Sequence, residues 1–154
     1  MEFKIQEIEG LETLEIFHLV EESKAAGFRF LEKLVNDYQD GTNRFNKHGE
    51  SLYGVYNEQG VLIAIGGLNI DPYSNKPKIG RLRRFYVASD FRRSGVGSLL
   101  LSKIILEAKN YYEGLVLHTD TDQADLFYTA FGFSKTCDYP NSTHYINLYQ
   151  KGIM

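Results

Sequence analysis

The stretch LRRFYVASDFRRSGVGSLL, from Leu82 to Leu100, decides the fold and contains the most informative loop of the chain. It begins as a strand, passes through an arginine pair and ends in helical periodicity, so residues 95–97 (Gly-Val-Gly) open a helix. Glycines there let the backbone come close to a ligand, and the first helical turn presents unpaired N–H groups and a positive dipole end. With charged hydrogen bonds from Arg92 and Arg93, this loop is suited to a diphosphate.

Charge is distributed unevenly around this loop. The whole chain has a net charge of -3, yet between Lys76 and Lys103 there is a single acid, Asp90. The basic residues of this segment are Lys76, Lys78, Arg81, Arg83, Arg84, Arg92, Arg93 and Lys103. A solvated basic surface would show the same pattern, but the glycine loop within the cluster favours a local site for a phosphorylated ligand.

Hydrophobic periodicity predicts the elements on either side of the loop. The expected strands are 3–8, 52–56, 61–70, 79–87, 115–119, 133–138 and 143–149, and the expected helices are 11–25, 31–38, 95–110 and 122–131. Strand 79–87, helix 95–110 and strand 115–119 form a crossover, so these two strands should be parallel, and the flanking hairpins antiparallel. The expectation is a mixed sheet with helices on both faces, in the α/β or α+β class.

The apolar stripes of the helices indicate which faces should be buried. In helix 11–25 the expected stripe is Leu14, Phe17 and Val20. In helix 95–110 it is Val96, Leu99, Leu100 and Ile104, and in helix 122–131 it is Ala124, Phe127, Tyr128 and Phe131. Gly132 stands where a C-cap glycine ends a helix.

The composition, 43% apolar and 24% charged, is that of an ordinary soluble globular protein. The first ten residues are not a secretory signal, and no stretch approaches the ~18 apolar residues of a membrane span. One cysteine, Cys137, forms no intrachain disulfide, and four scattered histidines give no metal-ligand spacing. We therefore expect one cytoplasmic domain over residues 1–154 that binds no metal, membrane or nucleic acid.

Three kinds of phosphate-binding loop compete for residues 92–97. A P-loop requires Gly-Lys followed by Ser or Thr, which does not occur in the chain. A Rossmann loop is closer because Asp120 ends the next strand, but Leu100 replaces its third glycine and Gly95 lies well beyond the strand end at Val87. The third pattern is [Arg/Gln]-x-x-Gly-x-[Gly/Ala], which residues 92–97 match.

This third pattern is the coenzyme A pyrophosphate loop of the GNAT N-acetyltransferases, and the resemblance covers almost the whole chain. Residues 82–100 resemble the fourth strand and third helix of that family. Residues 124–133, ADLFYTAFGF, resemble its fourth-helix motif, Ala-x-x-[Leu/Phe]-Tyr-x-x-x-Gly-Phe. The resemblance implies the acyl-CoA N-acyltransferase fold, with about six to seven strands, about four helices, and a fourth and fifth strand that splay apart.

The resemblance also implies a site, with acetyl-CoA as the co-substrate. The pantetheine arm would pair with the main chain of Phe85, Tyr86 and Val87. The pyrophosphate contacts would come from Arg92, Arg93, Ser94, Gly95, Val96, Gly97 and Ser98. Thr121 takes the place of a frequent asparagine and is a further candidate contact. Tyr128 would face the thioester sulfur as the catalytic acid, whereas without the motif it would be a core aromatic on the helix stripe.

The motifs do not identify the group that deprotonates the amine. Some relatives carry a glutamate on the fourth strand, where this chain has Arg81 and Arg83, and others carry one early in the fifth, where it has Val116. His118 shares a strand face with Val116 and an imidazole can accept a proton, although a hydrogen-bonded histidine at a strand end is the commoner role. Asp120 and Asp122 could equally be helix N-terminal acids. We expect deprotonation through water by an unassigned residue.

The acceptor is expected to be a small-molecule or peptide amine bound by the first two helices and the sheet ends. That region holds acids and aromatics that suit a cationic amine, although such residues are also common on surfaces: Asp37, Tyr38, Asp40, Glu50, Tyr53 and Tyr73. Two other functions stay open, a non-catalytic acetyl-CoA-binding sensor and a nucleotide-binding protein. A homodimer is expected only by analogy with the family.

Overall fold

The computed structural model describes residues 2–149, so Met1 and residues 150–154 of the expected domain lie outside the described part. The elements are β1 (Lys4–Glu7), α1 (Thr13–Ala25), α2 (Phe30–Asp40), β2 (Ser51–Tyr56), β3 (Leu62–Ile70), β4 (Ile79–Val87), a 3₁₀ helix (Ser89–Phe91), α3 (Val96–Ala108), β5 (Gly114–Leu117), α4 (Asp122–Phe131), β6 (Ser134–Lys135) and β7 (His144–Asn147). Their order is the predicted one. The largest difference is β6, which keeps only two residues of the predicted strand 133–138.

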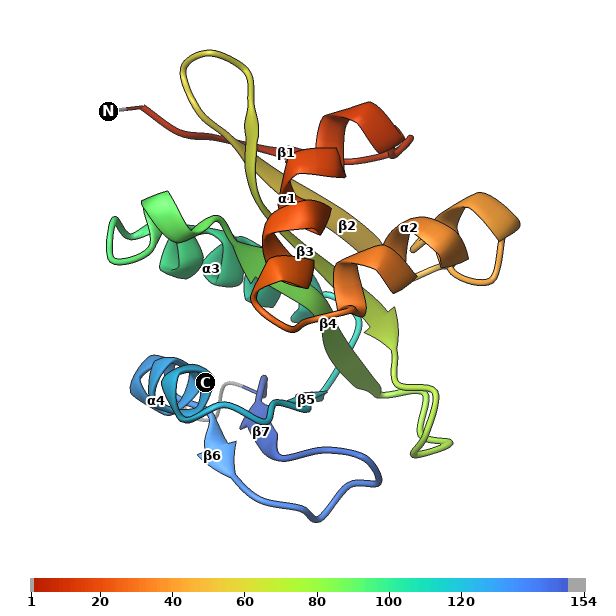
Figure 1. Cartoon of the computed structure of the whole chain (residues 1–154). Helices are drawn as coiled ribbons and strands as arrows, with labels where there is room; N and C mark the ends of the chain where they lie inside the picture. Colours follow the sequence, from red (N-terminus) through yellow and green to blue (C-terminus); the bar gives the residue numbers. More distant parts are fainter. Residues whose placement is uncertain (1, 150–154) are drawn as a thin grey trace.

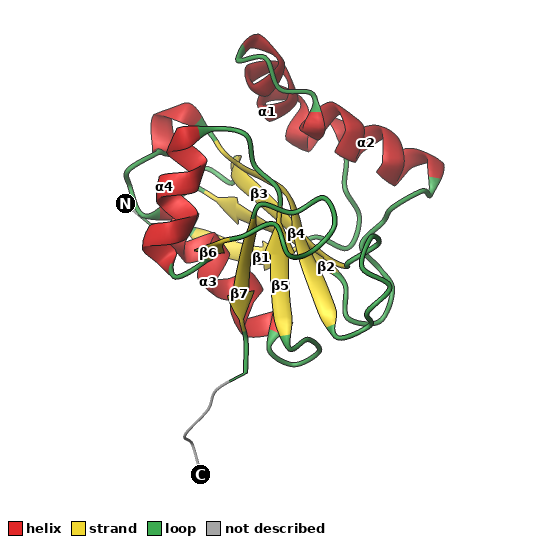
Figure 2. Cartoon of the chain, turned by 90° about the horizontal axis from the view of Figure 1, so that it is seen from below, coloured by secondary structure: helices red, strands yellow, loops and turns green. Residues whose placement is uncertain are grey.

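The strands form one sheet in the order β1-β2-β3-β4-β5-β7-β6. The pair β4–β5 is parallel and the other pairs are antiparallel, as predicted. Helices α1 and α2 lie on one face, and α3 and α4 lie on the other (Figures 1 and 2). Within residues 2–149, no helix is long and apolar enough to cross a bilayer.

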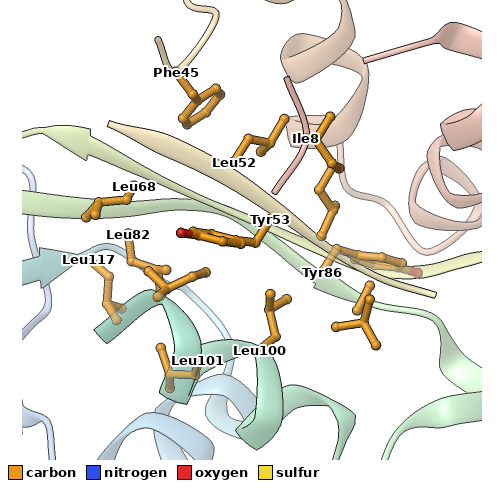
Figure 3. Close-up of a cluster of buried hydrophobic side chains, with 14 of the residues drawn as sticks. Ile8, Phe45, Leu52, Tyr53, Leu68, Leu82, Tyr86, Leu100, Leu101 and Leu117 are labelled. Carbon is orange, nitrogen blue, oxygen red and sulfur yellow. The ribbon is translucent and has the colours of Figure 1, made fainter. Parts of the chain in front are cut away.

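The core fills both faces of the central strands. Figure 3 shows Leu100 and Leu101 of α3 beneath the sheet and Phe45 and Leu52 above it, and all four side chains are buried. These contacts hold β2, β3 and β4 together and so fix the position of the C-terminal half of β4.

The predicted apolar stripe of α1 is wrong for Leu14 and Phe17, whereas Val20 packs against the core. Leu14 is 90% exposed and Phe17 is 55% exposed. The buried residues are instead Ile16, Leu19 and Ser23. The polar Ser23 hides the true stripe from a hydrophobicity pattern, and it tolerates burial because its hydroxyl donates to the Val20 carbonyl at 2.9 Å. In α3, Leu99 is likewise 41% exposed, so its place in the predicted stripe is also wrong.

Strand β4 contains a bulge. Arg84 and Phe85 together stand opposite Gly66 of β3, because the register shifts between Ile65 and Gly67. Arg84 has a φ of 58°, in the left-handed region that side chains other than glycine seldom adopt. A Cβ on Gly66 would lie 2.8 Å from the Phe85 ring, so only glycine lets this ring pack so close to β3.

Strands β4 and β5 are joined over a short distance only. Their pairs are Ile79 with Gly114, Gly80 with Leu115, and Arg81 with Val116. Among the strands that the structure describes, β5 pairs with no residue of β4 after Arg81. The remaining six residues of β4 therefore diverge from β5, which is the splayed arrangement expected from the sequence.

Candidate active site

A cavity of about 840 Å³ opens where β4 and β5 diverge, a size typical of small-molecule sites. Residues 81–87 line one side and residues 117–121 line the other. Because β4 runs from the point of divergence at Arg81 to Val87 beside the glycine loop, the cavity has an inner part near Arg81 and a loop end near Val87. Phe28 and Phe30 from the α1–α2 connection complete the wall.

The glycine loop presents free amides at the loop end of the cavity. Gly95 is the N-cap of α3 with a φ of 86°, and the helix begins with the bond from the Leu99 N–H to the Gly95 carbonyl at 3.0 Å. The N–H groups of residues 95–98 therefore have no intrahelical acceptor, and no side chain of residues 2–149 caps them. A Cβ on Gly95 would meet no atom within 4 Å. These features fit a bound diphosphate.

The predicted loop contacts are brought together, with two exceptions. The cavity lining includes Arg92, Arg93, Gly95, Gly97 and Ser98. Ser94 and Val96 are outside it: the Ser94 hydroxyl donates to the Phe91 carbonyl, and the Val96 side chain is fully buried in the core. These two residues can reach a ligand only through their backbone.

The predicted β4 contacts, Phe85, Tyr86 and Val87, all line the cavity. The Ala88 N–H donates to the Ile63 carbonyl of β3 at 2.8 Å, so the alternation of a strand directs the main-chain groups of Val87 away from β3 and into the gap. Arg92 Nε donates to the Val87 carbonyl at 3.0 Å, which fixes the glycine loop to the end of β4.

Glu22 ties α1 to the loop end. Its carboxylate accepts the Tyr86 hydroxyl, the Ser89 N–H at 3.0 Å and the Ser89 hydroxyl at 3.1 Å. Burial alone would raise the pKa of Glu22, but these bonds and the nearby Arg92 lower it. Burial and the bond to Glu22 raise the pKa of Tyr86 to about 12. Glu22 therefore stays ionised and strongly bonded, which makes it a poor base for an amine.

Tyr128 lies between the cavity and the core. It is 6% exposed, and its ring centroid is 6.1 Å from that of Phe85 and 5.6 Å from that of Phe133. It lines the cavity, and its hydroxyl makes no hydrogen bond within the described residues. Burial raises the pKa of Tyr128, so the hydroxyl stays protonated and available as a donor.

The segment after β5 brings His118, Asp120 and Thr121 to the cavity. The Thr121 hydroxyl oxygen already accepts the Ala124 N–H at 3.1 Å as the N-cap of α4, and its O–H proton remains free to donate to a cofactor. His118 Nε2 lies 3.6 Å from Asp120 Oδ1. Among the described residues of the lining, His118 is the one histidine and Asp120 the one carboxylate.

Five arginines line the cavity, namely Arg81, Arg83, Arg84, Arg92 and Arg93. Arg81 is neutralised, because its Nε donates to Asp71 Oδ1 at 2.7 Å and both residues are buried. Its other nitrogens donate to the carbonyls of Asn141 and Pro140 at 2.8 and 2.9 Å. This network fixes two connections of the sheet at the point of divergence. Of the charged side chains that remain in the described lining, four are arginines and one is Asp120, so the cavity is cationic.

Sequence reasoning missed part of the acceptor side. Of the acids and aromatics expected there, Tyr73 lines the cavity, whereas the others are outside the lining: Asp37, Tyr38, Asp40, Glu50 and Tyr53. Phe28, Phe30 and Asn141 line it without having been predicted. The Arg83-Arg84 pair was a signal for the presence of both residues in the cavity lining, because two adjacent arginines break the alternation expected of a central strand.

Comparison with known proteins identifies the family. A family model described as an acetyltransferase (GNAT) domain matches residues 48–135, more than half of the chain. A candidate acetyltransferase from Exiguobacterium sp. 255-15 is 28% identical, with a TM-score of 0.84 over 96% of this chain and 94% of that chain.

Two more distant structures share the fold. A GNAT family acetyltransferase from Elizabethkingia anophelis, solved with acetyl-CoA bound, is 20% identical with a TM-score of 0.63 over 94% of this chain and 97% of that one. Glucosamine-6-phosphate N-acetyltransferase from Arabidopsis thaliana is 19% identical with a TM-score of 0.63 over 89% and 95%. No curated protein matched the chain. With the family model, the splayed strands and the amide-lined loop in agreement, the chain belongs to the GNAT acetyltransferases, which use acetyl-CoA as the acetyl donor.

Proposed function

We propose that this chain moves the acetyl group of acetyl-CoA to a primary amine of a small molecule or peptide by direct attack on the thioester. The observation that carries the proposal is the divergence of β4 from β5 after three residue pairs, with free amides at the loop end of the resulting cavity and Tyr128 in its wall. When bound, acetyl-CoA supplies an activated acyl group. The remaining chemistry falls to side chains and amides of the chain itself.

Residues 92–98 hold the diphosphate, and the β4 main chain from Phe85 to Val87 holds the pantetheine arm. The Val87 N–H, directed into the gap, is the group best placed to bind the thioester carbonyl oxygen. Tyr128 donates its proton toward the departing thiolate. Burial makes Tyr128 a weaker acid, but the same apolar surroundings make the thiolate a stronger base, so the two stay matched.

The amine must lose a proton before it attacks. A lysine-like amine has a pKa of about 10.4, so only about one molecule in 2,500 is neutral at pH 7. The arginines of the cavity favour this neutral form, because like charges disfavour an ammonium ion. His118 is our proposed proton acceptor, because an imidazole can accept a proton and His118 is the one histidine in the described lining. The rest of the described lining offers arginines and tyrosines but no other group that is a free base at neutral pH.

Thiol release from acetyl-CoA in the presence of a panel of primary amines tests this function. Turnover should fall sharply in Tyr128→Phe, and the acid limb of the pH–rate profile should change in His118→Gln. Tight acetyl-CoA binding without turnover on any amine would instead favour a sensor. Preference for NAD over coenzyme A in calorimetry would overturn the assignment of the loop.

The assembly and extent of the protein stay predictions. A homodimer, which sedimentation would detect, rests on analogy with the family. A single domain over residues 1–154 rests on the length and composition of the chain.

A further inference from the structure

Arg84 is a buried cation whose hydrogen-bonding capacity is not used. Its side chain is 12% exposed, and its Nη2 is fully buried without a hydrogen-bond partner. Its ion pair with Asp37 is long, with 3.9 Å between Nη2 and Oδ2, and Asp37 also pairs with Lys33 at 3.4 Å. A guanidinium left in this state is costly. Its Nε and Nη1 also make no hydrogen bond within residues 2–149 and are not fully buried, so these two nitrogens are available to a partner in the cavity.

The surroundings of Arg84 are cationic and aromatic. It lines the cavity beside Arg83, for which no hydrogen bond or ion pair is found among residues 2–149, and near Tyr73. Burial, followed by the charge of Arg83, lowers the pKa of Arg84, and the opposing effects of Asp37 and Tyr73 do not offset this. The only carboxylate in the described lining, Asp120, belongs to the opposite wall after β5.

The position of Arg84 along β4 separates it from the diphosphate end. The loop that presents free amides is fixed to Val87, whereas Arg84 lies in the bulge nearer the point of divergence. Its left-handed backbone, with a φ of 58°, is held there by the pairing of the neighbouring residues with β3. Arg92 and Arg93 therefore lie at the loop end of the cavity, where the diphosphate would bind, and Arg83 and Arg84 lie in its inner part.

We propose that the amine acceptor carries an anionic group, a carboxylate or a phosphate, that binds to the Arg84 guanidinium beside Arg83 and Tyr73. The inference rests on the proposed acetyl transfer and names the class of its acceptor. A carboxylate or a phosphate offers paired oxygens that match the fork of a guanidinium. The acceptor site thus binds an anionic group while its cationic wall disfavours the protonated amine.

The test compares matched primary amines that differ in the anionic group. The pairs are L-amino acids with their carboxamides, and phosphoethanolamine with ethanolamine. The measured quantity is the ratio of kcat/KM for the anionic and the neutral member, in the native chain and in Arg84→Gln. Comparing this ratio between the two chains cancels the intrinsic difference in amine pKa, because that difference belongs to the substrates.

We expect the ratio to fall by about 10- to 100-fold in Arg84→Gln, which corresponds to the loss of one charge-assisted contact. Only the kcat/KM of the anionic member should fall, while that of the neutral member stays at its native value. Arg29→Gln is the matched control, since that guanidinium is 76% exposed and pairs with Glu32; its ratio should equal the native one. Asp37→Asn should preserve or raise the ratio, because it removes the competing carboxylate. If Arg84 served only to pair with Asp37, this variant would instead act like Arg84→Gln.

Two outcomes overturn the inference while leaving acetyl transfer intact: equal ratios in the native chain and Arg84→Gln for both pairs, or a loss shared by the neutral amines. If Arg84→Gln does not fold, Arg84→Asn provides the same comparison, because asparagine tolerates a positive φ. If no amine is acetylated, calorimetric titration of the two chains with phosphoethanolamine and with ethanolamine, in the presence of coenzyme A, decides whether the anion site exists. Selective binding of phosphoethanolamine that Arg84→Gln abolishes would support the anion site although the proposed function had failed, and binding without selectivity would refute it.

Discussion

Replacing Gly95 with alanine should separate the ligand-binding role of the glycine loop from its role in folding. Gly95 has a φ of 86°, and a Cβ there would meet no atom within 4 Å, so the folding cost comes from backbone strain and not from a clash. Left-handed backbone costs a residue with a side chain about 1–2 kcal/mol, partly offset by the stiffer unfolded chain. We expect Gly95→Ala to lower the free energy of unfolding by about 1 kcal/mol.

The same substitution should weaken coenzyme A binding by more than this strain explains. Relaxing the strain shifts the amides of residues 95–98, and a hydrogen bond to a charged phosphate is worth about 1.5–3 kcal/mol. Losing one such bond raises the Kd of coenzyme A about tenfold or more. Gly60 provides the matched control, because its φ is 78°, its Cβ would also meet no atom within 4 Å, and it lies in the distant β2–β3 turn.

Urea unfolding and calorimetric titration with coenzyme A give the two quantities. Gly95→Ala and Gly60→Ala should lose similar stability, while only Gly95→Ala loses affinity. Native affinity in Gly95→Ala together with the stability loss of Gly60→Ala would show that the loop does not approach the ligand, and the reasoning about free amides would be refuted.

Further predictions concern the catalytic acid, a buried ion pair and pH. Tyr128→Phe should lower kcat about 10²- to 10⁴-fold without changing stability. The control Tyr112→Phe removes a buried hydroxyl that donates to a carbonyl at 2.6 Å, so it should cost about 1 kcal/mol of stability and leave kcat unchanged. The opposite pattern would contradict the assignment of Tyr128 as the acid. Asp71→Asn leaves Arg81 buried without its carboxylate and should cost about 3–5 kcal/mol in urea unfolding, and a loss below about 1 kcal/mol would argue against that pair. Because the folded pKa of Glu22 is lowered, its stabilisation is present above its unfolded pKa and is lost as the pH falls through the folded one. The stability difference between the native chain and Glu22→Gln should therefore shrink as the pH falls below the ordinary glutamate value of 4.5, and a constant difference would be the contrary result.

The sequence predicted the elements with strong local signals. Strand β4, the glycine loop and α3 follow one another without interruption, and local propensity and periodicity agree in each of them. The C-cap at Gly132 was predicted for the same reason, and its φ of 127° in the structure requires glycine. The divergence of β4 and β5 came from the family resemblance alone, since no local pattern encodes where two parallel strands stop pairing.

The features that periodicity missed depend on contacts between distant segments. The buried face of α1 follows the sheet that it covers, and burial of Ser23 is possible because a local hydrogen bond satisfies its hydroxyl. The pairing of Arg81 with carbonyls of residues 140 and 141 joins segments about 60 residues apart. The bulge at Arg84 depends on the register between β3 and β4, which a single strand does not specify.

Amide hydrogen exchange, followed by NMR with and without coenzyme A, tests the central claim most directly. If the N–H groups of residues 95–98 bind the diphosphate and the Val87 N–H lines the gap, these amides should become strongly protected on binding, while those of β1 should not change. Protection elsewhere, with residues 95–98 exchanging as fast as in the free protein, would contradict the account.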